Sequence, residues 1–223
     1  MAEFGNEMKL LIENWREYLN EGEETHFPWL EDLKQRGKEA LMGDNFEKIG
    51  SGAFRIVFQP KGDEDHVVKL SKKSHNNWMN KVEMKTGNFY PSIFPKTFAH
   101  ADDWGWVVQE AVNVLTPKNQ EAHLGEVLYK TFPEISVDFG SREELSEPIE
   151  LWDLITRALF NPTSSDEIEL QAYGLENEKA FRELSSAVAR FKIDPEDLKM
   201  GNIGFDKDNF LKILDASVFF KIG

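Results

Sequence analysis

Residues 197–202 read Asp-Leu-Lys-Met-Gly-Asn, and a second acid, Asp215, follows after two short apolar runs. The first acid can orient or deprotonate a hydroxyl group. The amide of Asn202 and the second acid are hard oxygen ligands suited to Mg²⁺. Acid, amide and acid in this order are typical of phosphoryl-transfer sites. Asp197 is therefore a candidate catalytic residue, and Asn202 and Asp215 are candidate metal ligands.

A second informative stretch lies upstream at residues 49–57 and reads Ile-Gly-Ser-Gly-Ala-Phe-Arg-Ile-Val. Gly50 and Gly52 alternate between two predicted strands, so the backbone can pass close to phosphates with its amides available as donors. No Gly-Lys-Ser/Thr follows, which excludes a Walker A loop. A strand rather than a helix is predicted next, which excludes a dinucleotide-binding fingerprint. Ordinary hairpins also contain such glycine pairs, so this stretch alone does not decide between a hairpin and a phosphate loop.

Lys69 stands among apolar residues in the run Val-Val-Lys-Leu at 67–70. A buried ammonium group is costly unless it has an anionic partner. Glu83, on the helix predicted next, and a phosphate are the two candidate partners. Taken alone, Lys69 favours the alternative of an edge-strand lysine with its head in solvent. Glu83 could likewise be a solvated helix residue.

The order of these elements resembles the protein-kinase-like fold: glycine loop, strand lysine, helix glutamate, apolar strand, helix, acid–amide motif and hairpin. The resemblance covers roughly residues 46–217 and looks closest to compact members, such as small bacterial and viral kinases and antibiotic or small-molecule phosphotransferases. Asp-Leu-Lys-Met-Gly-Asn-Ile-Gly is similar to the Asp-Leu-His-x-Gly-Asn form of those proteins. The matching residues are Gly50, Gly52, Val57, Lys69, Glu83, Gln109-Glu110-Ala111-Val112, Asp197, Asn202 and Asp215.

The resemblance implies ATP and Mg²⁺ as cofactors and assigns a role to each matching position. Lys69 would contact the α- and β-phosphates of ATP and would be held by Glu83. Asp197 would position the acceptor hydroxyl, and Lys199 would neutralise charge on the transferring phosphoryl group. Asn202 and Asp215 would bind Mg²⁺. The remaining nucleotide contacts would come from Gly50, Ser51, Gly52, Ala53, Phe54 and Val57, and from backbone groups of Glu110 and Val112 at the adenine edge.

The sequence also departs from the usual kinase pattern. Arg55 replaces the third glycine of the loop, so we expect a looser or differently shaped phosphate cover. Pro195 and Glu196 stand where a histidine usually precedes the catalytic acid, and Asp-Phe-Gly becomes Asp-Ala-Ser at 215–217. Because few residues follow Asp215, we expect no activation segment or peptide-binding helices. The expected acceptor is a hydroxyl of a protein serine or threonine, of the chain itself or of a small molecule.

Composition limits the remaining function classes. The 223 residues carry a formal net charge of −14, which disfavours nucleic acid or an anionic membrane as the main partner. With no cysteine, thiolate chemistry and disulfides are excluded. The absence of a signal-like N-terminus or a long apolar run predicts a soluble cytoplasmic protein. The acidic surface suggests an alternative function, a weak or inactive kinase-like protein that binds a partner protein.

We expect an α+β fold with two lobes. Its domains would be an N-terminal helical extension at 1–45, a sheet-rich lobe at 46–112 and a reduced helical lobe at 113–223. Apolar spacing and turn residues predict the individual elements. The predicted helices span 7–20, 28–43, 76–86, 147–160 and 176–191, and the predicted strands span 46–49, 54–59, 66–70, 106–110, 203–205 and 210–214.

Overall fold

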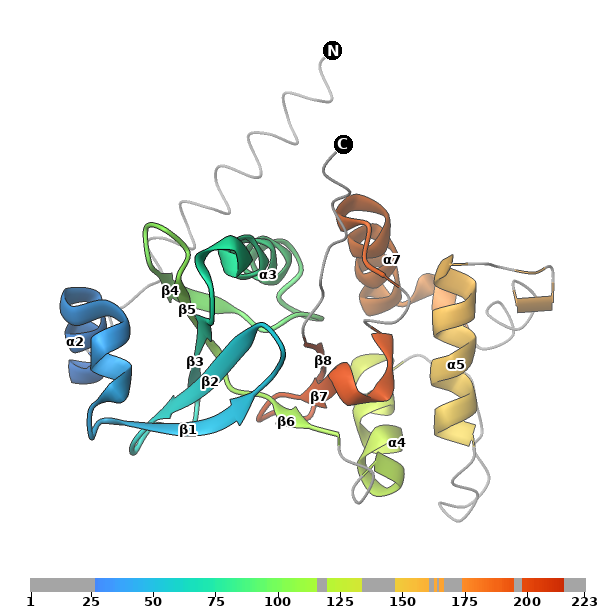
Figure 1. Ribbon diagram of the computed structural model, residues 1–223. Coiled ribbons are helices and arrows are strands. Elements are labelled where there is room, and N and C mark those ends of the chain that lie inside the picture. The colour runs from blue at the N-terminus through green and yellow to red at the C-terminus, as the bar shows by residue number, and fades with distance from the viewer. Residues whose placement is uncertain are drawn as a thin grey trace, which may run out of the picture.

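A five-stranded antiparallel sheet forms one half of the molecule and helices form most of the other half (Figure 1). The computed structural model describes residues 27–115, 120–133, 147–160, 163, 165–166, 174–194 and 198–214. The strand order is β1-β2-β3-β5-β4, which places β3 in the middle of the sheet. The predicted α+β architecture is confirmed. The strands are β1 (Phe46–Ser51), β2 (Arg55–Pro60), β3 (His66–Ser71), β4 (Thr97–His100) and β5 (Trp106–Glu110).

Helix α2 (Pro28–Arg36) and the 3-10 helix η1 (Gly37–Met42) cover one face of this sheet. The sequence predicted one continuous helix to about Gly43, and this prediction is wrong at Gly37. Gly37 has a φ angle of 59° and a ψ angle of −137°, a conformation that glycine tolerates and that an α-helix cannot continue through. Below these helices lies an apolar core formed by Trp29, Leu33, Ala40, Leu41, Phe46, Phe58, Val68, Leu70, Trp106 and Val108.

Helix α3 (Asn77–Phe89) contacts strands β3, β4 and β5. Side chains alternate between the faces of a strand, so Val68 and Leu70 pack toward α2 while Lys69 points toward α3. A close approach at Gly87 brings α3 near the segment that leads to β4. A Cβ atom at Gly87 would lie 2.2 Å from the carbonyl oxygen of Pro95, so no larger residue fits there without a backbone shift.

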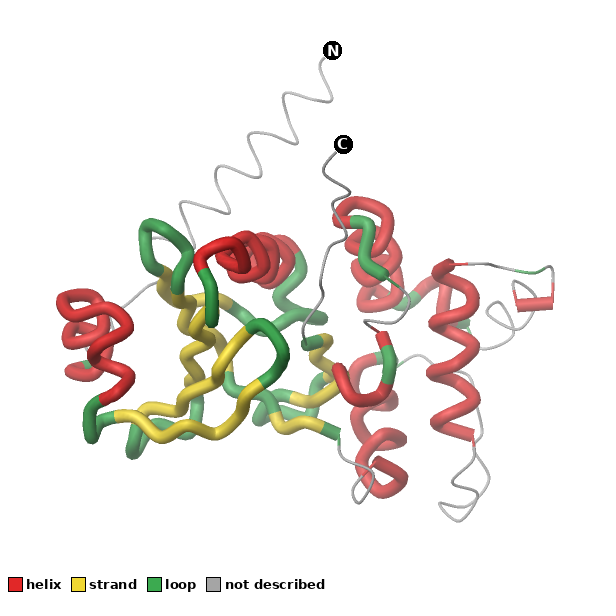
Figure 2. Tube along the Cα trace, in the orientation of Figure 1, coloured by secondary structure: helices red, strands yellow, loops and turns green. Residues whose placement is uncertain are grey.

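The second half is mainly helical (Figure 2). It contains α4 (Gln120–Thr131), α5 (Glu147–Phe160), α7 (Lys179–Phe191), and the 3-10 helices η3 (Leu175–Asn177) and η5 (Met200–Asn202). A small sheet joins β6 (Asn113–Val114), β7 (Ile203–Phe205) and β8 (Leu211–Ile213) in that order. The helix predicted at 147–160 and the predicted hairpin are confirmed. Helix α4 was missed, because the sequence around it mixes proline, glycine and charges.

A second apolar core lies among these helices and includes the fully buried Trp152, Phe132 and Leu184. Val82 of α3 and the residues Ile93 and Phe94, which follow α3, belong to this core rather than to the first. The helix that carries Glu83 is therefore packed against both halves of the molecule. The helix predicted at 7–20 lies outside the described residues. None of the described helices has the length and apolar character that a membrane crossing requires.

Candidate active site

The site begins with a buried ion pair between β3 and α3. The Nζ atom of Lys69 donates to Oε2 of Glu83 at 2.9 Å. Both side chains are less than a tenth exposed, at 8% and 7%. Because β3 is a central strand, the alternative of an edge-strand lysine in solvent is wrong, and so is that of a solvated Glu83. The predicted pairing of the two side chains is present, while their role toward a nucleotide stays a prediction.

Arg55 joins the same carboxylate from a third element. One terminal guanidinium nitrogen lies 2.6 Å from Oε1 of Glu83, and the Arg55 side chain is 7% exposed. The register of β2 and β3 explains this position, because Val57 pairs with Lys69 and Arg55 pairs with Ser71. Arg55 therefore lies one pair further along the face that carries Lys69. In the sequence Arg55 stands out only as a replacement for the third loop glycine, and nothing there indicates its partner.

The glycine loop between β1 and β2 is held at both ends. The amide of Gly52 donates to the carbonyl of Arg55 at 3.0 Å, and the amide of Lys72 donates to the carbonyl of Phe54 at 2.9 Å. The Lys72 ammonium group also donates to the carbonyl of Gly52. Neither Gly50 nor Gly52 has a positive φ, and a Cβ at Gly52 would meet nothing within 4 Å. The fold itself therefore does not require glycine at position 52.

The end of β5 borders a cavity of about 800 Å³. Its lining includes Ile49, Val67 and the segment 110–113, which is where the resemblance predicts the adenine edge. The backbone amide of Glu110 donates to the carbonyl of Lys96 at 2.9 Å, so this amide is already engaged. The amide of Ala111 likewise donates to the carbonyl of Asp65 at 2.8 Å. Backbone hydrogen bonds therefore fix residues 110 and 111. Val112, the second predicted adenine contact, follows directly after them.

Asp197 and Asp215 lie outside the described residues, but their neighbours in the sequence are well fixed. The indole nitrogen of Trp152 donates to the carbonyl of Leu198 at 3.0 Å, in a buried hydrogen bond. The amide of Leu214 donates to the carbonyl of Asn202 at 2.7 Å. The residue before Asp215 is thereby bonded to Asn202, the other predicted metal ligand. Lys199 is exposed, and its carbonyl accepts the amide of Asn202 at 2.8 Å.

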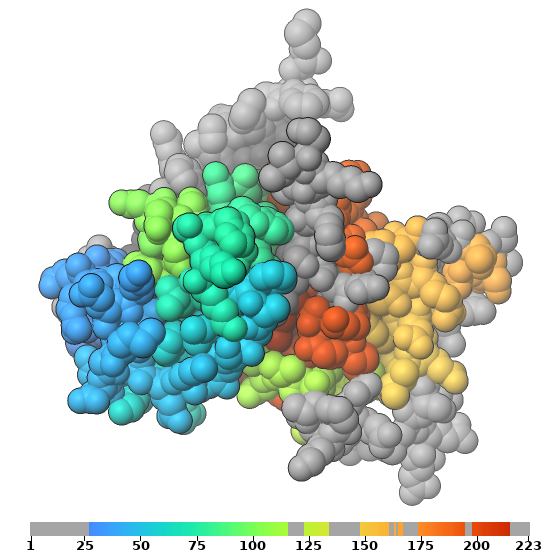
Figure 3. All heavy atoms as spheres, viewed as in Figure 1, coloured from blue at the N-terminus to red at the C-terminus, as the bar shows by residue number. Residues whose placement is uncertain are grey.

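Two observations place the β7–β8 hairpin close to the ion pair of Lys69 and Glu83. The amide of Ile213 donates to the carbonyl of Ile93 at 2.8 Å. Ile213 also shares with Lys69 and Glu83 a cavity of about 10 Å³, the size of a single water probe. Figure 3 shows the β1–β2 region in blue to cyan on the same face of the molecule as the orange-red segment that contains η5. The described β7–β8 hairpin and the Lys69–Glu83 pair are therefore neighbours in space.

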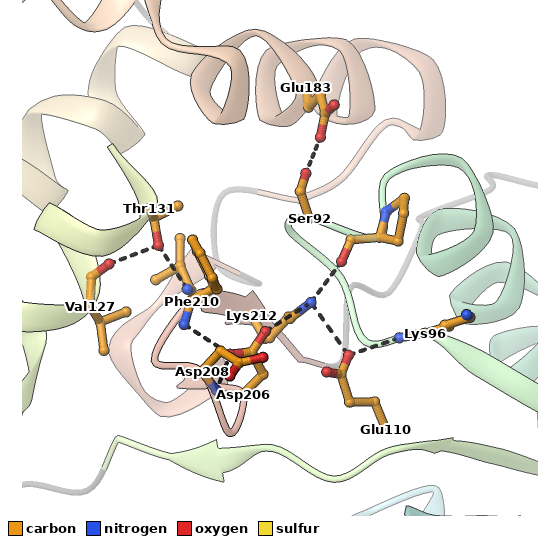
Figure 4. A network of polar contacts seen from close by, with 12 residues as sticks. Ser92, Lys96, Glu110, Val127, Thr131, Glu183, Asp206, Asp208, Phe210 and Lys212 are labelled. Carbon is orange, nitrogen blue, oxygen red and sulfur yellow. Dashed lines mark hydrogen bonds and ion pairs between the residues drawn. The ribbon is translucent and has the colours of Figure 1, made fainter. Parts of the chain in front are cut away.

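A buried lysine was missed by the sequence analysis (Figure 4). The ammonium group of Lys212 donates to the carbonyl of Pro91 at 2.6 Å and lies 3.3 Å from Oε2 of Glu110 and 3.4 Å from Oδ2 of Asp206. Asp206 also accepts the amides of Asp208 and Phe210 with its other oxygen, both at 2.9 Å. Lys212 thus ties the end of β5 to the β7–β8 turn. The sequence does contain a signal for Lys212, because a charged residue between two apolar ones in a short predicted strand indicates a buried charge.

Sequence comparison gave no match, either to a family model or to a curated protein. Among solved structures, the ADP-bound aminoglycoside phosphotransferase APH(2'')-Ib is 14% identical, with a TM-score of 0.38 over 85% of this chain and 69% of that one. The choline kinase LicA from Streptococcus pneumoniae is 13% identical, with a TM-score of 0.37 over 84% and 68%. A choline/ethanolamine kinase family protein from Mesorhizobium loti is 18% identical, with a TM-score of 0.34 over 83% and 64%.

All three TM-scores lie below 0.4, and the identities do not exceed 18%. The likeness is therefore distant.

Proposed function

We propose that this protein is an ATP- and Mg²⁺-dependent phosphotransferase that transfers the γ-phosphoryl group to a hydroxyl. The observation that carries the proposal is the buried pair of Lys69 and Glu83, with Nζ and Oε2 2.9 Å apart. A buried lysine on a central strand costs folding free energy, even when paired. Such a cost is explained when the ammonium group serves a ligand, and a phosphate next to the glycine loop is the ligand that fits its charge.

The glycine loop supports this interpretation. Glycine at position 52 is not required by φ or by packing within the chain, since a Cβ there would meet nothing within 4 Å. A close approach of the backbone to a bound phosphate supplies a reason for it. The cavity beside residues 110–113 is of the size of a small-molecule site, and Ile49 and Val67 give it apolar walls for a base.

The remaining roles follow the positions assigned by the resemblance. Asp197 orients the acceptor hydroxyl, and Lys199 neutralises charge on the transferring group. Asn202 and Asp215 hold Mg²⁺, which neutralises phosphate charge when bound. The hydrogen bond from the Leu214 amide to the Asn202 carbonyl supports this pairing, because it brings the two ligand-bearing segments together. Catalysis then depends on positioning rather than on a covalent enzyme intermediate.

We also propose that the chain is organised in three parts. The segment 1–45 is a helical extension, 46–112 is the lobe that holds the nucleotide, and 113–223 is a reduced second lobe. The acceptor is a protein serine or threonine, the chain itself or a small molecule, and the protein works in the cytoplasm. Two separate apolar cores, one under α2 and one among α4, α5 and α7, support two lobes.

The test is phosphate transfer from γ-labelled ATP, measured with and without Mg²⁺. Product is followed in the protein band and in a mixture of amino alcohols and amino sugars. We expect Mg²⁺-dependent labelling by the wild type, and at least a hundredfold loss in Lys69→Ala and Asp215→Ala. Lys73→Ala is the control, because Lys73 is an exposed lysine just after the same strand. Equal rates in all four proteins would refute the assignment.

A binding protein without catalytic activity is the second candidate. One observation favours it, since the bulky Arg55 occupies the third-glycine position and is buried against Glu83. In this case the acidic surface, from a net charge of −14, would engage a basic partner protein. Failure of ATP to bind, with or without Mg²⁺, would favour this candidate over the enzyme.

A further inference from the structure

We propose that Arg55 is a positioning residue, which fixes the carboxylate of Glu83 so that Lys69 is held ready for the phosphates of a nucleotide. The inference rests on the proposed function and adds to it a residue that the kinase pattern does not contain at this position. The third glycine of the loop is absent here, and an arginine with a defined partner stands in its place.

The geometry gives each oxygen of one carboxylate its own cation. Oε1 of Glu83 lies 2.6 Å from the guanidinium group of Arg55, and Oε2 lies 2.9 Å from the ammonium group of Lys69. The three side chains come from β2, β3 and α3, and each is less than a tenth exposed. The Lys69 contact is a hydrogen bond, whereas the Arg55 contact is a close ion pair without hydrogen-bond geometry. Attraction between opposite charges is strong in such buried surroundings, and it restricts rotation of the groups that it joins.

A carboxylate held on one oxygen alone is less well oriented. The terminal torsion of glutamate is broad and has no sharply preferred value, so a single contact leaves it free to turn. Arg55 reduces this freedom by contacting the other carboxylate oxygen. Its planar guanidinium group is also better suited than an ammonium group to fixing a carboxylate. Without Arg55, Glu83 and therefore Lys69 would adopt several arrangements.

The register of the sheet makes this arrangement specific. Arg55 pairs with Ser71, and Val57 pairs with Lys69, so Arg55 and Lys69 are diagonal neighbours on one face of β2 and β3. Glycine at position 55 would offer no side chain to this face. Lys61 is an exposed cation in the turn just after the other end of β2, outside this face, and supplies a matched control.

The experiment compares the affinities of ATP and adenosine by isothermal titration calorimetry in the presence of Mg²⁺. The proteins are wild type, Arg55→Ala, Arg55→Lys, Lys69→Ala and Lys61→Ala, with Glu83→Gln and the double variant of Arg55→Ala and Glu83→Gln. Adenosine carries no phosphate, so its affinity reports the integrity of the base site. The ratio of the two affinities reports the phosphate contacts alone.

We expect Arg55→Ala to weaken ATP binding about tenfold and to leave adenosine binding within about twofold. Arg55→Lys should lose less, and Lys61→Ala nothing. Because Arg55 acts through Glu83, Arg55→Ala should cause no further loss in the Glu83→Gln background. If Arg55→Ala does not fold, the smaller, phosphate-specific loss expected for Arg55→Lys remains the test.

Three results would overturn the role of Arg55. They are equal losses for ATP and adenosine, tighter ATP binding after Arg55→Ala, or a full tenfold loss that persists in the Glu83→Gln background. ATP binding that depends on Lys69 but not on Arg55 would remove this inference and leave the proposed function standing. A wild type that binds no ATP would refute the proposed function, and this inference with it.

Discussion

Replacing Lys212 by methionine should destabilise the protein strongly, because Lys212 is the buried cation between the two halves (Figure 4). Its ammonium group lies 3.3 Å from a carboxylate oxygen of Glu110 and 3.4 Å from one of Asp206, and it donates to the carbonyl of Pro91 at 2.6 Å. Methionine keeps most of the apolar stem, so the change removes mainly the charge and its hydrogen bonds.

The size of the loss in unfolding free energy depends on the carboxylates that remain without their cation. Asp206 is 9% exposed and Glu110 23% exposed at the side chain, so the substitution leaves one buried and one half-buried carboxylate without this cation. Breaking a buried pair by removing one partner costs about 3–5 kcal/mol. Asp206 keeps the amides of Asp208 and Phe210, which lowers its share of the cost. We expect a loss of about 3 kcal/mol in the free energy of unfolding.

Urea denaturation followed by tryptophan fluorescence measures this loss. The control is Lys207→Met, because Lys207 lies in the same hairpin, is 73% exposed and is 3.5 Å from Asp65. An exposed pair of this kind contributes about 0–1 kcal/mol. A loss below about 1 kcal/mol for Lys212→Met, or equal losses for the two variants, would refute the reasoning that Lys212 ties the halves together.

Three further substitutions test other contacts. Gly87→Ala should cost about 1–3 kcal/mol of unfolding free energy, because its Cβ would lie 2.2 Å from the Pro95 carbonyl, whereas Gly52→Ala should cost little; equal costs in urea titrations would contradict the packing at Gly87. Trp152→Phe should cost about 1–3 kcal/mol, since the buried Leu198 carbonyl loses its donor, and an unchanged denaturation midpoint would argue against this hydrogen bond. Hydrogen bonds from Thr163, with the Arg157 guanidinium beside it, lower the pKa of Asp166 below 3.8. The unfolded state therefore binds more protons at low pH, so the stabilisation by Asp166 relative to Asp166→Asn should be complete above pH 3.8 and shrink below it, and an opposite trend would contradict this sign.

The sequence predicted the elements whose side chains repeat regularly. β3, β5, α3, α5 and the β7–β8 hairpin were located to within a few residues, because each has a clear apolar period or a clear turn. The break at Gly37 was not predicted, since a glycine within an apolar helical pattern is compatible with both outcomes. Helix α4 was not predicted, because the sequence around it has no clear signal for the start or the end of a helix.

Within the candidate site, local motifs were visible and contacts across strands were not. Lys69 and Glu83 could be paired because the resemblance supplied their order along the chain. Arg55 could not be placed beside them, since its position depends on the register of β2 against β3. Lys212 is a similar case, because its partner Glu110 ends β5 of the large sheet and its partner Asp206 lies in the turn between β7 and β8.

The most direct test of the account is the affinity for ATP with and without Mg²⁺, measured by calorimetry on the wild type and on Lys69→Ala. The account predicts that Mg²⁺ strengthens ATP binding to the wild type. It also predicts that Lys69→Ala weakens that binding at least about tenfold, since a charged contact to phosphate is lost. Binding of ATP that is unaffected by Lys69→Ala, or no binding to the wild type at all, would contradict the claim that the Lys69–Glu83 pair serves a nucleotide.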